Sequence, residues 1–378
     1  MERKNFIKLA GAGSVGALTI SGIAACSSTS AEKNSVAVTP KKKVLMKVGC
    51  QSGGTSVKNL EFKARCGVYN IDGGAPLMIK GVGWDLADSQ AKKEACEKYG
   101  ITLEGYHLPL DSSGYERTAM PNVMLGKSPA RDKEIEILQN CIRVAGQTGV
   151  KFVTYNTTIF PVLRTGRVID PMRGNASYSA WNYEEAVKRN EPKTIAGDVS
   201  VDEIFERITY LLDRIMPVAK EYNVRLANHI ADPPTPVGYR GITRWNSPDV
   251  FEGIKRFAQL YDPTHHGFLL CLGSVAEGLK DPKTEILPII KWVGERNQIV
   301  NVHLRNIKGG WNNFQEVYPD NGDMDFIQII RELRDVGYEG MLCPDHVPQH
   351  PDPESGNQAF AFSYGYIKGL LQAVASEA

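Results

Sequence analysis

The amino-acid sequence predicts a protein of the α/β class that folds as one (β/α)8 TIM barrel. Short apolar runs alternate with longer amphipathic segments from Val44 onward, and this alternation recurs eight times, as in folds with a parallel sheet covered by helices. A chain of 378 residues could also form two domains, but no break in the pattern demands a second one. We therefore expect residues 44–378 to form a single barrel domain.

The eight predicted strands are short apolar runs rich in β-branched residues. Strands that are buried on both faces of a parallel sheet have this composition. From the N-terminus they are Val44–Gln51, Cys66–Ile71, Ile101–Leu108, Lys151–Asn156, Val224–Ile230, Gly267–Leu272, Ile299–Leu304 and Gly340–Pro344.

The segments between these strands have helical periodicity. Ser200–Glu203 fits a capping box, and an apolar stripe with three- and four-residue spacing follows it. Ser247–Pro248 predicts a helix start with a cap and a first-turn proline. A further helix should begin after Asp325 and end at Gly337. Phe160–Ile195, which is rich in Arg, Pro, Gly and Asn, predicts a long loop covering an active site.

The N-terminus predicts export and lipid anchoring. Met1–Lys8 is basic, Leu9–Ile23 is apolar, and Ile23–Cys26 resembles a bacterial lipobox, so Cys26 would be lipidated and residues 1–26 form the signal segment. Part of the basic run also resembles a twin-arginine signal, with Lys4 in place of the second arginine. A membrane anchor helix is the alternative, but the apolar segment is short and contains several glycines.

We therefore expect an exported lipoprotein on the periplasmic or outer-membrane side of a bacterium, with residues 27–43 as a flexible tether. The 44 basic and 43 acidic residues nearly balance, which argues against a nucleic-acid partner and leaves the lipid as the only link to a membrane. Six cysteines remain after Cys26, without a CxxC pair, so no disulfide framework is expected. The sequence leaves a homo-oligomer open.

Four predicted strand ends in the second half of the chain carry side chains that can bind a metal. These are His229, Cys271, His303 and Asp345, each about one β/α unit after the previous one. Because consecutive strands of a barrel end at one mouth, the four side chains should converge there. Singly, each has an ordinary structural interpretation: a hydrogen-bonded histidine, a buried thiol or a turn aspartate. Their common position predicts a metal site.

The donor set indicates the kind of metal. Two imidazoles, a thiolate and a carboxylate suit manganese, iron, cobalt or zinc better than magnesium or calcium. A metal with free coordination positions could act as a Lewis acid.

Other side chains should lie near the same mouth. Arg305 could bind a carboxylate with its planar fork, and Lys308 adds positive charge for an anionic ligand. His346 is either a general acid or base or a support for Asp345. Glu316 could contact a substrate hydroxyl.

Several other patterns predict a structural role or no role in the site. Asp232 could orient a ligand, and His265–His266 precedes its strand, so the pair belongs to the opposite end of the barrel. No hydrolase elbow, Walker loop or dinucleotide fingerprint occurs in a fitting context. A G-x-G-x-x-G string begins at Gly11, but it lies within the predicted signal segment.

In these segments the sequence resembles the mannonate dehydratase family, which belongs to the xylose-isomerase-like barrels. The resemblance runs from about Leu125 to Gly369 and rests on the order of its segments. They are Leu125–Lys127, Arg131–Asp132, Tyr155–Asn156, Phe160–Thr165, His229, Asp232–Pro234, Leu270–Ser274, Val302–Ile307, Phe314–Glu316, Gly322–Asp325 and Pro344–His346.

The resemblance implies a hydro-lyase that converts D-mannonate to 2-keto-3-deoxy-D-gluconate and water. It implies that the four predicted ligands bind a divalent metal, commonly manganese, and that His346 works in acid/base catalysis. It also implies that Arg305 contacts the sugar acid and that Asn156 and Glu316 belong to the substrate site. The partner would then be a small sugar acid or sugar.

The sequence departs from the family pattern at three places. Cys343 stands where the family usually has a basic residue, Tyr318 stands where it has a histidine, and Ser355–Asn357 lacks the family's tyrosine. These departures keep two alternatives open: a sugar isomerase or epimerase on the same barrel, and a lipoprotein that binds carbohydrate without converting it.

Overall fold

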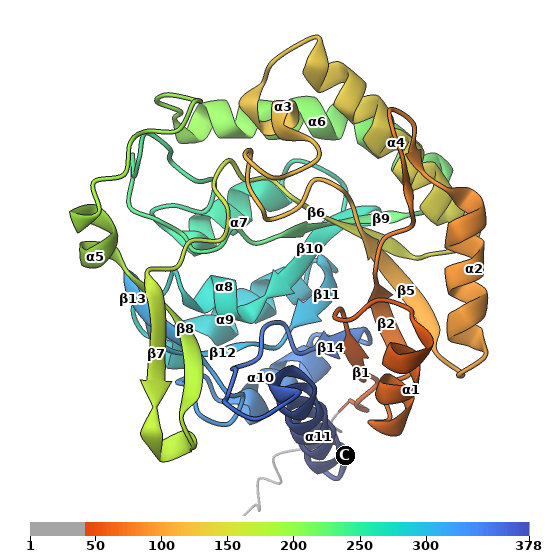
Figure 1. Cartoon of the computed structure of the whole chain (residues 1–378), viewed down its shortest axis with the longest axis vertical. Coiled ribbons are helices and arrows are strands. Elements are labelled where there is room, and N and C mark those ends of the chain that lie inside the picture. Colours follow the sequence, from red (N-terminus) through yellow and green to blue (C-terminus); the bar gives the residue numbers. More distant parts are fainter. Residues whose placement is uncertain (1–41, 378) are drawn as a thin grey trace, which may run out of the picture. The chain divides into compact units, whose positions relative to one another are not determined.

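The computed structural model describes residues 42–377. In this region parallel strands close into a barrel in the order β1-β14-β11-β10-β9-β6-β5-β2 (Figure 1), so the predicted (β/α)8 fold is confirmed. The barrel strands are β1 (Lys47–Cys50), β2 (Asn70–Gly73), β5 (Thr102–His107), β6 (Phe152–Asn156), β9 (Arg225–His229), β10 (His266–Cys271), β11 (Ile299–His303) and β14 (Met341–Cys343).

Each barrel strand falls on a predicted apolar run, although β2 begins later than expected. The sequence predicts that this strand begins at Cys66, but Cys66 caps the preceding helix and Gly67 follows with a φ of 69°. A positive φ is readily available to glycine. The strand therefore begins only at Asn70.

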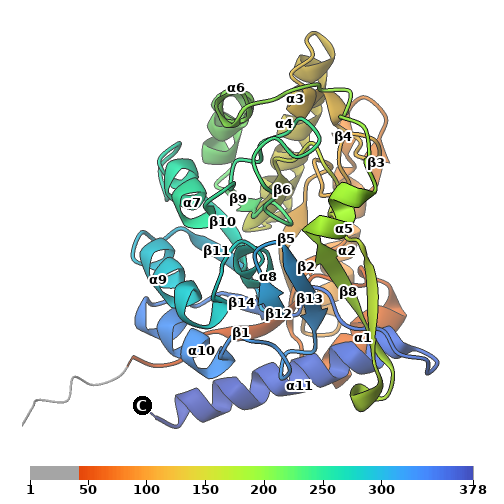
Figure 2. The ribbon, with the colours of Figure 1, turned by 90° about the vertical axis from the view of Figure 1, so that its left-hand side faces the viewer.

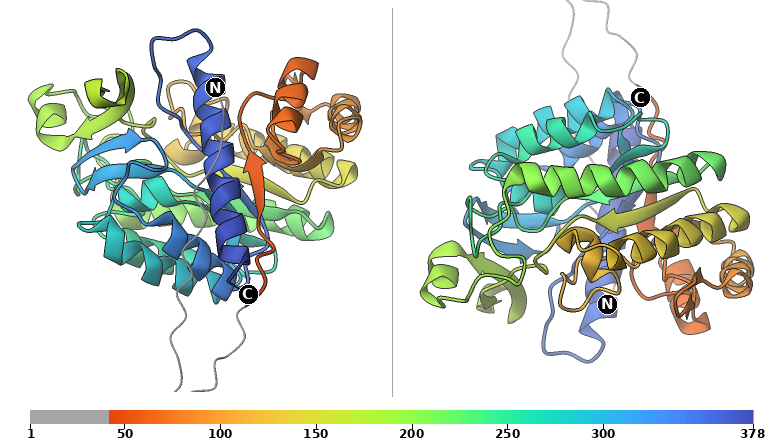
Figure 3. Two further views of the ribbon diagram at one scale, coloured as in Figure 1. Left: turned by 90° about the horizontal axis from the view of Figure 1, so that it is seen from below. Right: turned by 90° about the horizontal axis from the view of Figure 1, so that it is seen from above.

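Helices cover the outside of the barrel (Figures 2 and 3). The long ones are α1 (Val57–Arg65), α2 (Leu86–Glu97), α4 (Ala130–Thr148), α6 (Val201–Glu221), α7 (Val250–Ala258), α9 (Pro282–Gly294), α10 (Phe326–Asp335) and α11 (Ser355–Ala375). The short ones are α3 (Pro121–Leu125), α5 (Tyr183–Lys188), α8 (Leu272–Ala276) and the 3-10 turn η1 (Pro171–Arg173). Their buried faces and the outer faces of the strands form the main hydrophobic core.

The helix starts follow the predicted capping chemistry with one exception. Ser200 and Glu203 form the expected capping box at α6, and Asp325 caps α10 through the N–H groups of Ile327 and Gln328. Helix α7 does not begin at Ser247–Pro248, because Asp249 is its N-cap and accepts from two backbone N–H groups. A carboxylate that accepts two bonds near the positive helix end is the better cap.

The predicted loop at Phe160–Ile195 is wrong for most of its length. It contains the hairpin β7 (Gly166–Asp170) and β8 (Ala176–Asn182), followed by α5. Strand β8 pairs with β13 (Asn313–Val317), and β13 pairs with β12 (Asn306–Gly310), so a four-stranded antiparallel sheet forms beside the barrel (Figure 1). This pairing joins residues far apart in sequence, which local patterns do not reveal.

The remaining features are a short hairpin, the cysteines and the search for a membrane-spanning helix. Strands β3 (Met78–Ile79) and β4 (Gly83–Trp84) form a separate short hairpin. All six cysteines among residues 42–377 are free thiols. Within the same residues, no helix has the length and apolarity needed to cross a bilayer. The predicted signal segment with Cys26, and residues 27–41 of the tether, lie outside the described residues.

Candidate active site

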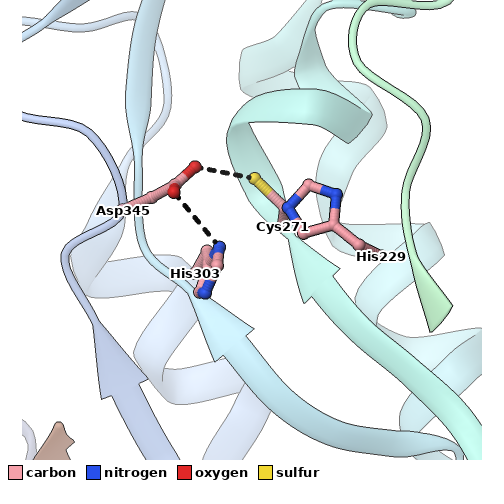
Figure 4. Close-up of side chains that lie close together, drawn as sticks. All are labelled: His229, Cys271, His303 and Asp345. Atoms are coloured by element: carbon pink, nitrogen blue, oxygen red, sulfur yellow. Dashed lines mark hydrogen bonds and ion pairs between the residues drawn. The ribbon is translucent and has the colours of Figure 1, made fainter. Parts of the chain in front are cut away.

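The four predicted metal ligands lie together at the carboxyl ends of consecutive barrel strands (Figure 4). His229, Cys271 and His303 are the last residues of β9, β10 and β11, and Asp345 follows β14. In the parallel register Cys271 is paired with His303. One ligand atom from each side chain lies within 4.8 Å of those of the other three.

The contacts inside this group leave buried polar atoms without a hydrogen bond. The Sγ of Cys271 lies 3.4 Å from Oδ2 of Asp345, and Nδ1 of His303 lies 3.4 Å from Oδ1 of the same carboxylate. Both ring nitrogens of His303 are buried and lack a hydrogen-bond partner. Because buried polar atoms in proteins are normally paired, the arrangement fits a cation bound among these four side chains.

Neighbouring groups orient the predicted ligands. Nδ1 of His229 donates to the carbonyl oxygen of Ile230 over 2.6 Å, which leaves the lone pair of a neutral ring on Nε2. Gln51, which follows β1, donates to Oδ1 of Asp345 over 2.7 Å. The backbone N–H of Ser274 lies 3.5 Å from the Cys271 sulfur. These supports hold nitrogen, sulfur and oxygen donors toward one point.

The electrostatics of the group suit a cation. Burial lowers the pKa of His229 and so keeps its imidazole neutral. Burial raises the pKa of the Cys271 thiol, although Arg305 acts in the opposite direction. Burial also opposes ionisation of Asp345, but cationic neighbours, His346 first among them, hold the pKa of that carboxyl well below its usual value. A divalent cation would favour the deprotonated thiol that ligation requires.

Arg305 lies behind the ligands rather than in the open mouth. Its side chain is 1% exposed, and Nη1 donates to Glu316 over 2.6 Å. Nη2 donates to Asp232 over 2.7 Å, to Glu277 over 2.9 Å and to Ser274 over 3.0 Å. Its hydrogen-bonding capacity is thus largely used within the protein, which differs from the predicted clamp on a substrate carboxylate.

Arg164 completes a buried charge cluster around the same carboxylates. It pairs with Asp232 over 2.7 Å, with Glu277 over 3.1 Å and, closer still, with Glu316. The three carboxylates could by their spacing also hold a cation, but two guanidinium groups already occupy that place. Burial raises the pKa of Glu277 well above its usual value, which brings the cluster closer to neutrality. We therefore infer that this cluster supports the four predicted metal ligands, His229, Cys271, His303 and Asp345, which are called the ligand group below.

The absence of a side chain at Gly273 allows Arg305 to lie close to the predicted ligands. A Cβ at this position would overlap the Arg305 guanidinium, so a residue without a side chain is required two residues after the end of β10. Asp232, which the sequence offered as a possible orienter of a ligand, contacts Arg164, Arg305 and Ser274. Nδ1 of His229 donates to a backbone carbonyl instead.

His346 lies at the mouth with an accessible ring. Its side chain is 45% exposed, and Nδ1 lies 3.0 Å from Oε1 of Glu316. Nε2 lies 3.6 Å from Oδ1 of Asp345. The Asp345 carboxylate raises the pKa of His346, while burial acts against it. Glu316 is buried and bonded to His346, Arg305 and Arg164, so its accepting oxygen is already shared.

The two other predicted substrate contacts are placed differently from each other. Asn156 ends β6 opposite His229 in the register, and both residues line a small pocket that also includes Asp232. Lys308 is exposed on β12, where it pairs with Gln315 in the side sheet. The structure thus brings Asn156, but not Lys308, to the ligand group.

The three departures from the family pattern have different surroundings. Tyr318 packs edge-on against aromatic side chains in the side sheet and α11. Cys343 is buried within the barrel, and Ser355 is the first residue of α11. Tyr364 does not replace the missing tyrosine, because it is buried and its hydroxyl contacts the Cys50 sulfur over 2.8 Å.

Sequence reasoning missed four residues of this region. Arg164 and Glu277 lie in segments without a local signal for a buried ion cluster, and Gln51 is one residue among many at strand ends. His107, however, is the last residue of β5 and carried the same signal as the predicted ligands: an imidazole at the end of a barrel strand.

Comparison with known proteins agrees with this geometry. A family profile described as D-mannonate dehydratase (UxuA) matches residues 176–378. The mannonate dehydratase of Streptococcus pneumoniae (strain 70585) is 27% identical over 343 residues, covering 83% of this chain and 89% of the relative. The crystal structure of mannonate dehydratase from Streptococcus suis serotype 2 superposes with a TM-score of 0.70 at 26% identity, covering 89% of this chain and 95% of that chain.

A more distant structure supports the fold alone. The xylose isomerase domain protein from Planctomyces limnophilus has a TM-score of 0.54 at 14% identity, covering 89% of this chain and 100% of that chain.

Proposed function

The chain belongs to the D-mannonate dehydratase family, and from this premise we propose that it is a metal-dependent hydro-lyase acting on a sugar acid. D-mannonate is the first substrate to test, with 2-keto-3-deoxy-D-gluconate and water as products. The observation that supports the proposal most is the buried imidazole of His303, whose ring nitrogens have no hydrogen-bond partner, within a group of two histidines, a cysteine and an aspartate.

The position of each residue suggests its role in the proposed reaction. His229, Cys271, His303 and Asp345 would hold a divalent metal, for which we expect manganese, with iron, cobalt and zinc as alternatives. A bound metal would supply Lewis acidity toward the substrate's oxygen atoms. Arg305 would act by positioning Asp345 and Glu316 rather than by touching the substrate.

Dehydration requires two proton transfers. One group removes the C2 proton of the sugar acid, and another protonates the departing C3 hydroxyl. His346 has an exposed ring beside Asp345 and is the first choice for one of these transfers. Asn156 lines the pocket next to His229 and has an amide that could bond a substrate hydroxyl.

The test is an assay of the purified protein loaded with manganese. Incubation with D-mannonate should form a 2-keto-3-deoxy acid, and removal of the metal by a chelator should abolish its formation until manganese is restored. A panel of other aldonates defines the stereochemistry. No product from any aldonate, with the metal shown to be bound, would contradict the proposal.

A second candidate is a sugar isomerase or epimerase, favoured by Cys343 and Tyr318, which stand where the family usually has basic residues. Proton NMR of the same incubations distinguishes it, because isomerisation redistributes the sugar signals without loss of water. Retention of a sugar without any conversion would instead indicate the binding-only alternative.

For the N-terminus we propose export and lipidation at Cys26, on the strength of the lipobox-like sequence alone. Mass spectrometry of the membrane fraction should find a lipid-modified N-terminal Cys26, and Cys26→Ala should release the protein from that fraction. An unmodified, full-length N-terminus would overturn this part.

A further inference from the structure

Across the barrel from the ligand group lies a second pair of titratable side chains. His107 ends β5 and Asp72 lies in β2. Nε2 of His107 and Oδ2 of Asp72 are 3.0 Å apart. In the order of strands around the barrel, β5 is directly opposite β11, which carries the predicted ligand His303.

The direction of the His107 side chain follows from the alternation along β5. Side chains two residues apart on a strand point to the same face. A Cβ at Gly105 would overlap the ring of Phe152, which belongs to the small cluster that fills the barrel interior together with Cys271. His107 therefore points into the barrel, at the level of its mouth.

Asp72 is fully buried and is held from both sides of the barrel. Its Oδ2 accepts from His107 and, over 3.3 Å, from the Nδ2 of Asn301. Asn301 lies on β11, two residues before His303. When Nε2 of the neutral His107 ring carries the hydrogen and donates it to Asp72, the lone pair of the ring lies on Nδ1. The His107 side chain is 33% exposed, so part of the ring is open to solvent.

We propose that His107, positioned by Asp72, is the base that removes the C2 proton of the sugar acid. The inference rests on the proposed function and assigns one of its two proton transfers. The C2–H bond breaks and its proton moves to Nδ1 of His107, while the bonding electrons shift onto the adjacent carboxylate to form an enediolate. In the second step these electrons return to form the C2=C3 double bond, the C3–O bond breaks, and the hydroxyl leaves as water with a proton from His346. The enol then becomes the 2-keto acid by proton exchange with solvent.

The surroundings of His107 favour this role. The charged groups that face it are the carboxylates of Asp72, Asp345 and Asp111. Burial disfavours the imidazolium, but these carboxylates outweigh it and raise the pKa of His107, which makes the ring a stronger proton acceptor. A carboxylate behind an imidazole stabilises the cation that forms when the proton arrives.

The experiment measures proton removal separately from loss of water. Manganese-loaded protein is incubated with D-mannonate and other aldonates in D2O, and NMR follows deuterium entering at C2 and formation of the 2-keto-3-deoxy acid. His107→Gln is the central variant, because an amide can still donate to Asp72 but cannot accept the proton. We expect at least a 100-fold lower kcat and a similar loss of C2 exchange, with KM and bound manganese unchanged.

Three further variants sharpen the assignment. His346→Gln should lose formation of the 2-keto acid but retain C2 exchange. His107→Ala should regain part of its activity when imidazole is added. Asp72→Asn should lower kcat without changing KM or metal content, as expected for a positioning residue. His265→Gln, a half-buried histidine at the other end of the barrel, is the matched control and should behave as wild type.

The outcomes separate this inference from the proposed function. If wild type exchanges the C2 proton without losing water, the dehydratase proposal fails, and the role of His107 stands only if His107→Gln abolishes the exchange. If His107→Gln keeps exchange and turnover within a few-fold of wild type, the inference is overturned. Absence of C2 exchange by wild type on every aldonate overturns it as well. A parallel loss of manganese in His107→Gln would indicate a structural role instead.

Discussion

Arg305 offers the clearest test of how the ligand group is supported. Its guanidinium is buried and bonded to Glu316, Asp232 and Glu277. Replacing it by methionine keeps most of the volume but leaves the three buried carboxyl groups, of which Asp232 and Glu316 are charged, with Arg164 as their remaining guanidinium partner. Breaking a buried ion pair from one side costs about 3–5 kcal/mol. Because the unfolding entropy grows with chain length, a domain of this size loses roughly 1.5 °C of Tm per kcal/mol, so Arg305→Met should lower Tm by about 5–7 °C.

The assay is thermal and chemical unfolding of the metal-free protein, so that lost metal does not contribute. Arg173→Met is the matched control, because Arg173 also pairs with a carboxylate, Asp320, but both side chains are about one-third exposed. Such surface pairs contribute about 0–1 kcal/mol. Adding Glu277→Gln to Arg305→Met should recover part of the lost stability, since it removes one of the stranded carboxyl groups.

The same variants decide between a support and a substrate contact. If Arg305→Met and Arg305→Lys unfold like wild type and only raise KM for the sugar acid, Arg305 is the carboxylate clamp that the sequence predicted, and the interpretation of the buried cluster is refuted. A lower Tm together with weaker manganese binding is the expected result.

Three other predictions concern single residues. Cys271→Ala should retain less than a tenth of the manganese bound by wild type in elemental analysis, and manganese should no longer raise its Tm. Cys66→Ala is the control and should bind manganese normally. Equal metal content in the two variants would show that Cys271 is not a ligand. Ser200→Ala breaks the capping box of α6 and should lower the free energy of unfolding by about 1 kcal/mol in urea titrations, with no change expected in manganese content. Burial lowers the pKa of His266 to about 4, so between pH 6.5 and 4 the unfolded chain binds a proton that the folded chain does not, and stability falls as the pH is lowered. This group alone should contribute a loss on the order of 3 kcal/mol, which His266→Gln should lack; parallel pH profiles for the two proteins would contradict it.

The ligand group shows which parts of a site can be predicted locally. His229, Cys271 and His303 each end an apolar run, and the spacing of these runs already implies neighbouring strands of a barrel. Once the chain forms a closed parallel sheet, its strand ends share one mouth, so convergence follows from topology. Lys308 was misplaced for a related reason: the chain leaves the barrel after Arg305 and enters the side sheet at β12, and no local pattern marked that turn.

The sequence by itself determined the barrel, the approximate positions of its strands and the four side chains that converge at its mouth, because burial patterns and strand ends are local properties. Only the tertiary structure decided that Arg305 lies inside a buried ion cluster and that His107 is held by Asp72 across from His303. These arrangements depend on pairs of residues from strands far apart in the sequence. Long-range packing alone brings such partners together, and it decides whether a charged side chain at the mouth faces the substrate or another part of the protein.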